Sequence, residues 1–118
     1  MRKIIIISAF ILTGIILITT ACEKLNLAED VPSCVEKKIR EIKKEDLRNP
    51  PAQVWKWAVD GKNYYYFNSD CCDQFNYLYD ENCNVVCAPD GGFTGHGDGN
   101  CPEFIGQIVR TLVWEDKR

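Results

Sequence analysis

The spacing of the cysteines constrains this chain of 118 residues more than any other feature of its sequence. Seven cysteines are present, and five of them lie in residues 71–104, CCDQFNYLYDENCNVVCAPDGGFTGHGDGNCPEF, together with most of the glycines. Short chains with this much cysteine are typical of secreted proteins, whose thiols pair as disulfides. The sequence therefore predicts one small domain that is stabilised by disulfides in an oxidising compartment.

The N-terminal residues predict export and lipid attachment. A basic start, MRK, precedes the apolar run IIIISAFILTGIILI, which is typical of a signal peptide and is shorter than the about 20 apolar residues of a spanning helix. The next residues, TTAC at 19–22, resemble the lipobox of bacterial lipoproteins, with threonine at the usual leucine position. We expect residues 1–21 to be a signal peptide and Cys22 to carry the acyl chains, palmitate included. Ordinary cleavage that leaves Cys22 as a free thiol is the alternative.

Lipidation of Cys22 would leave an even number of cysteines to pair. Those that we expect to form three disulfides are Cys34, Cys71, Cys72, Cys83, Cys87 and Cys101. Six cysteines allow fifteen connectivities. The adjacent Cys71 and Cys72 point to opposite faces of an extended backbone, so we expect them to bond elsewhere, with Cys34 as a candidate partner for one of them. An exported chain argues against the other use of such a cluster, a zinc site in a cytosolic protein.

The charge of the chain bears on its partners. The formal net charge is −3, and without residues 1–21, which hold two basic and no acidic residues, it becomes −5. A mildly acidic domain is unsuited to nucleic acid or to an anionic membrane surface. We therefore expect no nucleic-acid partner, membrane contact through the lipid, and a domain outside the cytoplasm in the bacterial cell envelope. A protein partner is expected but not identified.

We expect residues 22–33, which are polar and precede the first elements of the domain, to be a tether, with an extra strand added to the domain as the alternative. Ser33 and Glu36 have the spacing of a capping box, which predicts a helix that begins at Cys34. Its apolar residues recur at helical spacing as Val35, Ile39 and Ile42. The sequence NPP at residues 49–51 predicts its end, because proline lacks an amide donor and restrains the residue before it.

The run VWKWAVDGKNYYYF predicts a β-hairpin, because Asp60 and Gly61 separate two alternating aromatic stretches. With these two residues as the loop, the facing pairs are Val59 with Lys62, Trp57 with Tyr64, and Trp55 with Tyr66. We expect the aromatic face that results to pack against the helix. A platform on which sugars stack is the alternative.

The remainder of the chain predicts a second hairpin at residues 75–88, which turns at 80–84, and a last strand at residues 111–114. Together these elements predict a small disulfide-stabilised α+β domain over residues 34–118. Its expected architecture is one N-terminal helix packed on a twisted antiparallel sheet of hairpins.

The glycine-rich loop between Pro89 and Cys101 is the candidate binding site. Glycine permits close approach to a ligand, and loops carry function more often than cores do. The candidate residues are Asp90, Gly92, Phe93, Thr94, His96, Asp98 and Asn100. Their oxygen side chains suit a hard cation such as calcium, although PDGG and GDGN are also ordinary turn sequences. We expect no metal and no cofactor.

Neither an EF-hand nor a catalytic site is predicted. Asp80, Asn82 and Asn84 share the first spacings of an EF-hand calcium loop, but its glycine and glutamate positions hold other residues, so a turn is expected. His96 is the only imidazole in the chain, and the cysteines that could act as nucleophiles are expected to be oxidised. We expect a protein that is not an enzyme.

The motifs CCD, LYD, CAPDGG and GDG-x-CP, with NPP-x2-VW upstream and LVWED at the end, resemble a family of small, uncharacterised secreted bacterial domains that often occur on lipoproteins. The similarity covers most of residues 34–116. It implies location and architecture but no catalytic residues, because the family has no assigned activity. We expect a membrane-anchored binding or interaction module. The alternatives are an inhibitor of a secreted hydrolase, since a rigid loop lowers the ordering cost of binding, and a calcium-dependent binding module.

Overall fold

The computed structural model describes residues 24–118. The predicted signal peptide, residues 1–21, and the predicted lipidation site Cys22 lie outside the described residues. Within the described range, no helix combines the length and the apolar character that crossing a membrane requires.

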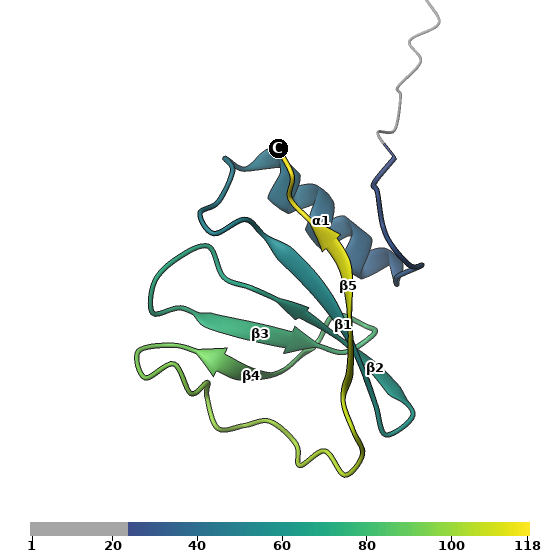
Figure 1. Cartoon of the computed structure of the whole chain (residues 1–118), viewed down its shortest axis with the longest axis vertical. Helices are drawn as coiled ribbons and strands as arrows, with labels where there is room; N and C mark the ends of the chain where they lie inside the picture. Colours follow the sequence, from purple (N-terminus) through teal and green to yellow (C-terminus); the bar gives the residue numbers. More distant parts are fainter. Residues whose placement is uncertain (1–23) are drawn as a thin grey trace, which may run out of the picture.

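One helix lies across one face of a five-stranded antiparallel sheet (Figure 1). The elements are α1 (Ser33–Lys44), β1 (Gln53–Val59), β2 (Lys62–Phe67), β3 (Phe75–Tyr79), β4 (Val85–Gly91) and β5 (Val109–Glu115). The strands lie in the order β4-β3-β2-β1-β5, so β4 and β5 form the two edges. Strands β1 to β4 pair in sequence order, whereas β5, the last strand, pairs with β1. The predicted α+β class is confirmed.

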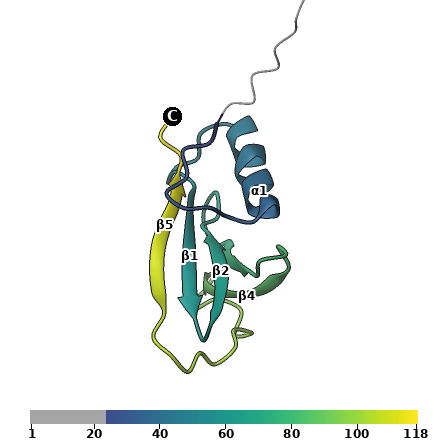
Figure 2. The same cartoon turned by 90° about the vertical axis from the view of Figure 1, so that its right-hand side faces the viewer.

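Helix α1 lies alongside the sheet (Figure 2), and its buried side chains form one apolar row. Its buried residues are Val35, Ile39 and Ile42, at the predicted helical spacing. The predicted capping box is wrong, because the N-cap is Pro32, which makes no side-chain capping hydrogen bond, and Ser33 is already the first helical residue. The helix ends at Lys44, before the NPP sequence, because Glu45 takes an extended backbone conformation.

The β1–β2 hairpin has the predicted register. Asp60 and Gly61 form its loop with positive φ angles of 52° and 74°, as a two-residue type I′ turn requires. The facing pairs are Val59 with Lys62, Trp57 with Tyr64, and Trp55 with Tyr66, as predicted. Local sequence is therefore sufficient to specify this hairpin.

The aromatic face of the hairpin, however, does not pack against the helix. Val54, Tyr65 and Phe67 belong to the core that contains the helix residues, whereas Trp57 and Tyr66 belong to a second cluster on the opposite face. The prediction was wrong because β1 and β2 carry apolar or aromatic side chains on both faces of the sheet. Either face could therefore have packed against the helix. The sheet thus buries side chains on both faces.

The segment that precedes the helix packs against the domain. Leu25 is 7% exposed and belongs to the main core. The amide of Ala28 donates a hydrogen bond of 2.9 Å to the carbonyl of Val113 in β5, and Glu29 forms an ion pair with Lys56. The described part of the predicted tether is therefore held to edge strand β5 and is not a free linker.

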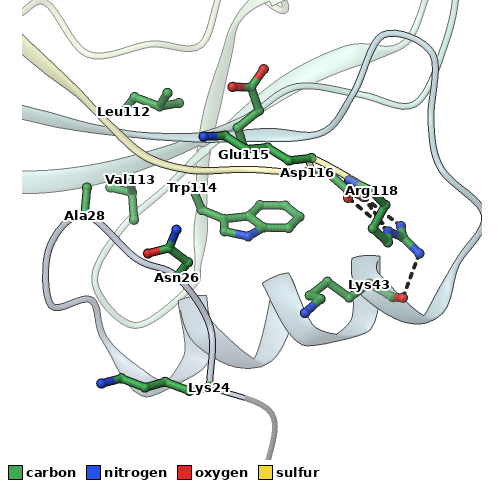
Figure 3. Close-up of a pocket in the computed structure, with 11 residues that line it drawn as sticks. Lys24, Asn26, Ala28, Lys43, Leu112, Val113, Trp114, Glu115, Asp116 and Arg118 are labelled. Carbon is green, nitrogen blue, oxygen red and sulfur yellow. Dashed lines mark hydrogen bonds and ion pairs between the residues drawn. The ribbon is translucent and has the colours of Figure 1, made fainter.

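The C-terminal residues close the end of α1 (Figure 3). The Arg118 guanidinium donates hydrogen bonds to the carbonyls of Lys43 and Glu45, at 2.9 and 2.8 Å, and to the buried carboxylate of Asp116 at 2.7 Å. Carbonyls at a helix C-terminus have no partner within the helix, so this side chain replaces a capping residue. A groove of about 460 Å³ lies beside these contacts, between β5 and the N-terminal segment. We infer that Arg118 and Asp116, which line this groove, stabilise the fold.

The Asp116 carboxylate makes the stability of the domain depend on acidity. Hydrogen bonds from Arg118 outweigh burial and hold the pKa of Asp116 below its usual value. Since the folded pKa is the lower one, the stabilisation is complete above the unfolded pKa, about 4, and is lost as pH falls through the folded pKa. Asp116→Asn should cost about 1.5 to 3 kcal/mol at pH 7 and progressively less below pH 4, measured by urea unfolding. A cost that stays constant from pH 7 to 2 would contradict this assignment.

Three disulfides link the described cysteines: Cys34–Cys83, Cys71–Cys72 and Cys87–Cys101. The expectation that Cys71 and Cys72 would bond elsewhere, one of them to Cys34, is wrong. That expectation assumed an extended backbone, whereas Cys72 and Asp73 have positive φ angles of 43° and 58° and form a tight turn. Cys34 instead joins α1 to the turn between β3 and β4.

Candidate functional site

The glycine loop, defined here as residues 91–100, is docked on the edge strand β4 from which it emerges. The amide of Asp98 donates to the carbonyl of Ala88 at 3.0 Å, and the amide of Gly97 donates to the carbonyl of Gly91 at 3.1 Å. A Cβ atom at Gly97 would lie 2.0 Å from the Ala88 carbonyl oxygen. Glycine is therefore needed at this position for approach to the strand, and the loop also covers an edge that could pair with another chain.

A second segment, residues 101–108, covers the aromatic face of the sheet. Phe104 packs edge-on against Tyr64 with 5.6 Å between the ring centroids. The Asp60 carboxylate in the β1–β2 turn accepts hydrogen bonds from the amides of Ile105, at 3.0 Å, and Gly106, at 2.8 Å. The disulfide Cys87–Cys101 ties the start of the segment to β4. Both ends of the segment are thus fixed to the sheet.

A cleft of about 510 Å³, the Trp57 cleft, opens between β4, the glycine loop and this segment. Its principal lining residues are Trp57, Asp90, His96, Phe104, Ile108 and Arg110. Buried Trp57 supplies an aromatic wall, and Tyr66 stacks beside it at a centroid distance of 5.5 Å. Ligand pockets typically combine such an apolar lining with a few polar groups, and their volumes are about 300 to 1,000 Å³.

The polar groups of the Trp57 cleft differ in how fully they are engaged. The Asp90 carboxylate accepts hydrogen bonds from the Tyr66 hydroxyl at 2.8 Å and from the Asn76 amide at 2.6 Å. Burial, together with Asp90, raises the pKa of Tyr66 far above its usual value, so this hydroxyl stays protonated and donates. The Arg110 guanidinium lies 4.5 Å from the centroid of the Trp57 ring. Among residues 24–118, no carboxylate forms an ion pair with Arg110.

The candidate loop residues predicted from sequence divide into two groups. Asp90 and His96 line the Trp57 cleft. The others do not line it: Gly92, Phe93, Thr94, Asp98 and Asn100. Asp98 accepts a hydrogen bond from the Asn100 amide at 2.9 Å, and this bond lowers the pKa of the Asp98 carboxyl. Since Asp90 lines the cleft and Asp98 does not, the two carboxylates do not form a common site there.

Phe93 lies at the tip of the glycine loop with 90% of its surface exposed. The Cys87–Cys101 disulfide and the bonds to β4 hold this loop in one shape. A rigid loop that presents an aromatic side chain is compatible with insertion into a hydrolase pocket. Hydrolase inhibition stays a prediction, and Phe93 is the residue on which it would depend.

Within the described part of the chain, no three His, Cys, Asp or Glu side chains are grouped to hold a metal ion. The Asp80 carboxylate instead accepts hydrogen bonds from the amides of Asn82 and Asn84, both at 2.9 Å. These bonds lower the pKa of Asp80. The prediction that DENCN forms a turn is confirmed.

Sequence reasoning missed three residues that make the cleft: Phe104, Ile108 and Arg110. Arg110 reaches the Trp57 ring because β5 pairs with β1, where Arg110 lies directly opposite Trp57. This pairing joins strands more than fifty residues apart, and no local pattern specifies it. The residues before LVWED, IVRT at 108–111, hold Arg110 as a single charged residue and show no alternation that would have indicated it.

Comparison with known proteins identifies one family. A family model described as "Domain of unknown function (DUF6970)" matches residues 40–116, which include all five strands and the Trp57 cleft. No curated protein and no solved structure matches the chain. The expected likeness to an uncharacterised domain family is confirmed. The chain belongs to the DUF6970 family of domains of unknown function.

Proposed function

We propose that this protein is an extracytoplasmic lipoprotein, anchored by an acylated Cys22, whose domain binds a small ligand in the Trp57 cleft and does not catalyse a reaction. The N-terminal sequence supports export and lipid attachment. Three cysteine pairs at bonding distance support an oxidising compartment. Acyl chains would hold the domain at the surface of the bilayer, outside its apolar interior.

The observation that carries the binding proposal is the arrangement of Arg110 and Trp57. The guanidinium lies over the aromatic ring, and both groups line a cleft of about 510 Å³. The Asp90 carboxylate lines the same cleft, where its Oδ1 atom accepts hydrogen bonds from Tyr66 and Asn76, but it forms no ion pair with Arg110 within residues 24–118. A ligand that combines a carboxylate with a flat apolar group would satisfy both the guanidinium donors and the aromatic wall.

Titration with small probes tests this proposal. Benzoate, N-acetylglucosamine and inorganic phosphate are added separately to the isotope-labelled protein while NMR signals of the Trp57 and Arg110 side chains are recorded. Benzoate should shift both, and Arg110→Gln should weaken its binding about tenfold or more, the effect of losing a charge-assisted hydrogen bond.

Arg40→Gln is the matched control, because Arg40 pairs with Glu36 on the helix, on the other side of the sheet. It should bind benzoate as the unaltered protein does. Equal loss in both variants, or no shift at the cleft with any of the three probes, would contradict binding at this site. If only N-acetylglucosamine shifts the signals, the ligand of the cleft is a sugar and not a carboxylate. The proposed role of Arg110 in binding a carboxylate would then be wrong.

A further inference from the structure

The disulfide Cys71–Cys72 differs from the other two in its surroundings. It lies in the loop between β2 and β3, where every residue from 70 to 75 is exposed. Cys87, by contrast, is 1% exposed, and its partner Cys101 is half-buried. Exchange with a thiol requires direct access to a sulfur atom, so Cys71–Cys72 is the pair that an external thiol reaches most readily.

Stabilisation of the fold does not account for this pair. In the chain-entropy description, the stabilisation that a disulfide gives increases with the logarithm of the number of residues that it encloses. Cys34–Cys83 spans 49 residues and Cys87–Cys101 spans 14, whereas Cys71 and Cys72 are already joined by their peptide bond. The bond between them restrains almost nothing in the unfolded chain.

Other contacts hold the loop in place, so the bond can open without loss of the fold. The Ser69 amide donates to the Asn76 side chain at 2.7 Å on one side of the pair. On the other side, the Gln74 carbonyl accepts a hydrogen bond of 2.9 Å from the Gly92 amide. Both contacts lie outside the two cysteines and remain when the sulfur atoms separate.

We propose that Cys71–Cys72 is a site of thiol–disulfide exchange with a protein dithiol outside the cytoplasm. A thiolate of the partner attacks one sulfur atom, the bond between the two cysteines breaks, and a mixed disulfide forms while the released cysteine takes up a proton. The second thiol of the partner then loses its proton, attacks the mixed disulfide and releases the other cysteine. Two electrons and two protons pass to the pair, and the partner ends as a disulfide.

The test uses the full chain, produced in an oxidising compartment and kept in detergent. Reduced thioredoxin serves as the protein dithiol, without denaturant, and samples are trapped over time with N-ethylmaleimide and mapped by peptide mass spectrometry. Cys71 and Cys72 should be labelled at least tenfold faster than Cys34, Cys87 or Cys101, with one thioredoxin oxidised per chain. Simultaneous opening of all three disulfides, or a Cys71–Cys72 bond that resists thioredoxin, would overturn the proposal.

A double variant, Cys71→Ser with Cys72→Ser, provides the control. It should keep the unfolding midpoint of the unaltered protein and should no longer oxidise thioredoxin. Retained oxidation of thioredoxin by this variant would place the exchange at another disulfide. Ligand binding in the Trp57 cleft is measured in a separate experiment, so the binding proposal and the exchange proposal can each fail without affecting the test of the other.

Discussion

Replacing Gly97 with alanine is expected to detach the glycine loop from strand β4 and to lower the free energy of unfolding by about 3 kcal/mol. Gly97 has a φ angle of 76°, which costs an L-residue about 1 to 2 kcal/mol. The added Cβ would also lie 2.0 Å from the Ala88 carbonyl oxygen, which accepts the hydrogen bond from Asp98. Relief of this overlap breaks backbone hydrogen bonds worth about 1 kcal/mol each.

The chain contains a matched control for this substitution. Gly95 has nearly the same φ angle, 77°, but an added Cβ there would meet no atom within 4 Å. Gly95→Ala should therefore show only the conformational cost of about 1 to 2 kcal/mol. Urea unfolding of the two variants separates the contributions. Equal destabilisation would show that the close approach of the loop to β4 contributes nothing measurable.

Removal of the Cys34–Cys83 disulfide is the second large effect that we expect. The double variant Cys34→Ala, Cys83→Ala should lose about 4 kcal/mol of stability, because the bond closes a long segment between α1 and the β3–β4 turn. Removal of Cys87–Cys101, which spans 14 residues, should cost about 3 kcal/mol by the same relation.

The order of these losses is more informative than either value. Urea unfolding of the two double variants, in the same buffer, gives the comparison. A larger loss for Cys87–Cys101 would indicate that native packing around buried Cys87 outweighs restraint of the unfolded chain. In that case the chain-entropy explanation for these disulfides would be wrong.

Local sequence predicts the features that depend on neighbouring residues. The Asp60-Gly61 turn sets the pairing of Trp57 with Tyr64, and Val35, Ile39 and Ile42 mark the buried side of α1. The face of the sheet that the helix covers was not predictable, because Tyr65 and Tyr66 offer aromatic rings to opposite faces. Packing of distant segments decides that question.

The candidate site was predictable only in part, for the same reason. Asp90 and His96 were expected in a binding loop from composition and do line the cleft. The glycines were expected to approach a ligand, whereas Gly97 approaches the strand of its own chain. Arg110 enters the site through the pairing of β5 with β1, and the bonded turn at Cys71 and Cys72 depends on backbone angles that no motif indicates.

Mass spectrometry of the intact protein, expressed in a bacterium with its own N-terminus and extracted from the membrane fraction, tests the central claim most directly. We predict a chain that starts at Cys22, carries acyl chains on that residue and holds no free thiol, with Cys34–Cys83 and Cys87–Cys101 found by peptide mapping. A chain without acyl groups that is recovered from the soluble fraction with reduced cysteines would contradict both the anchor and the extracytoplasmic location.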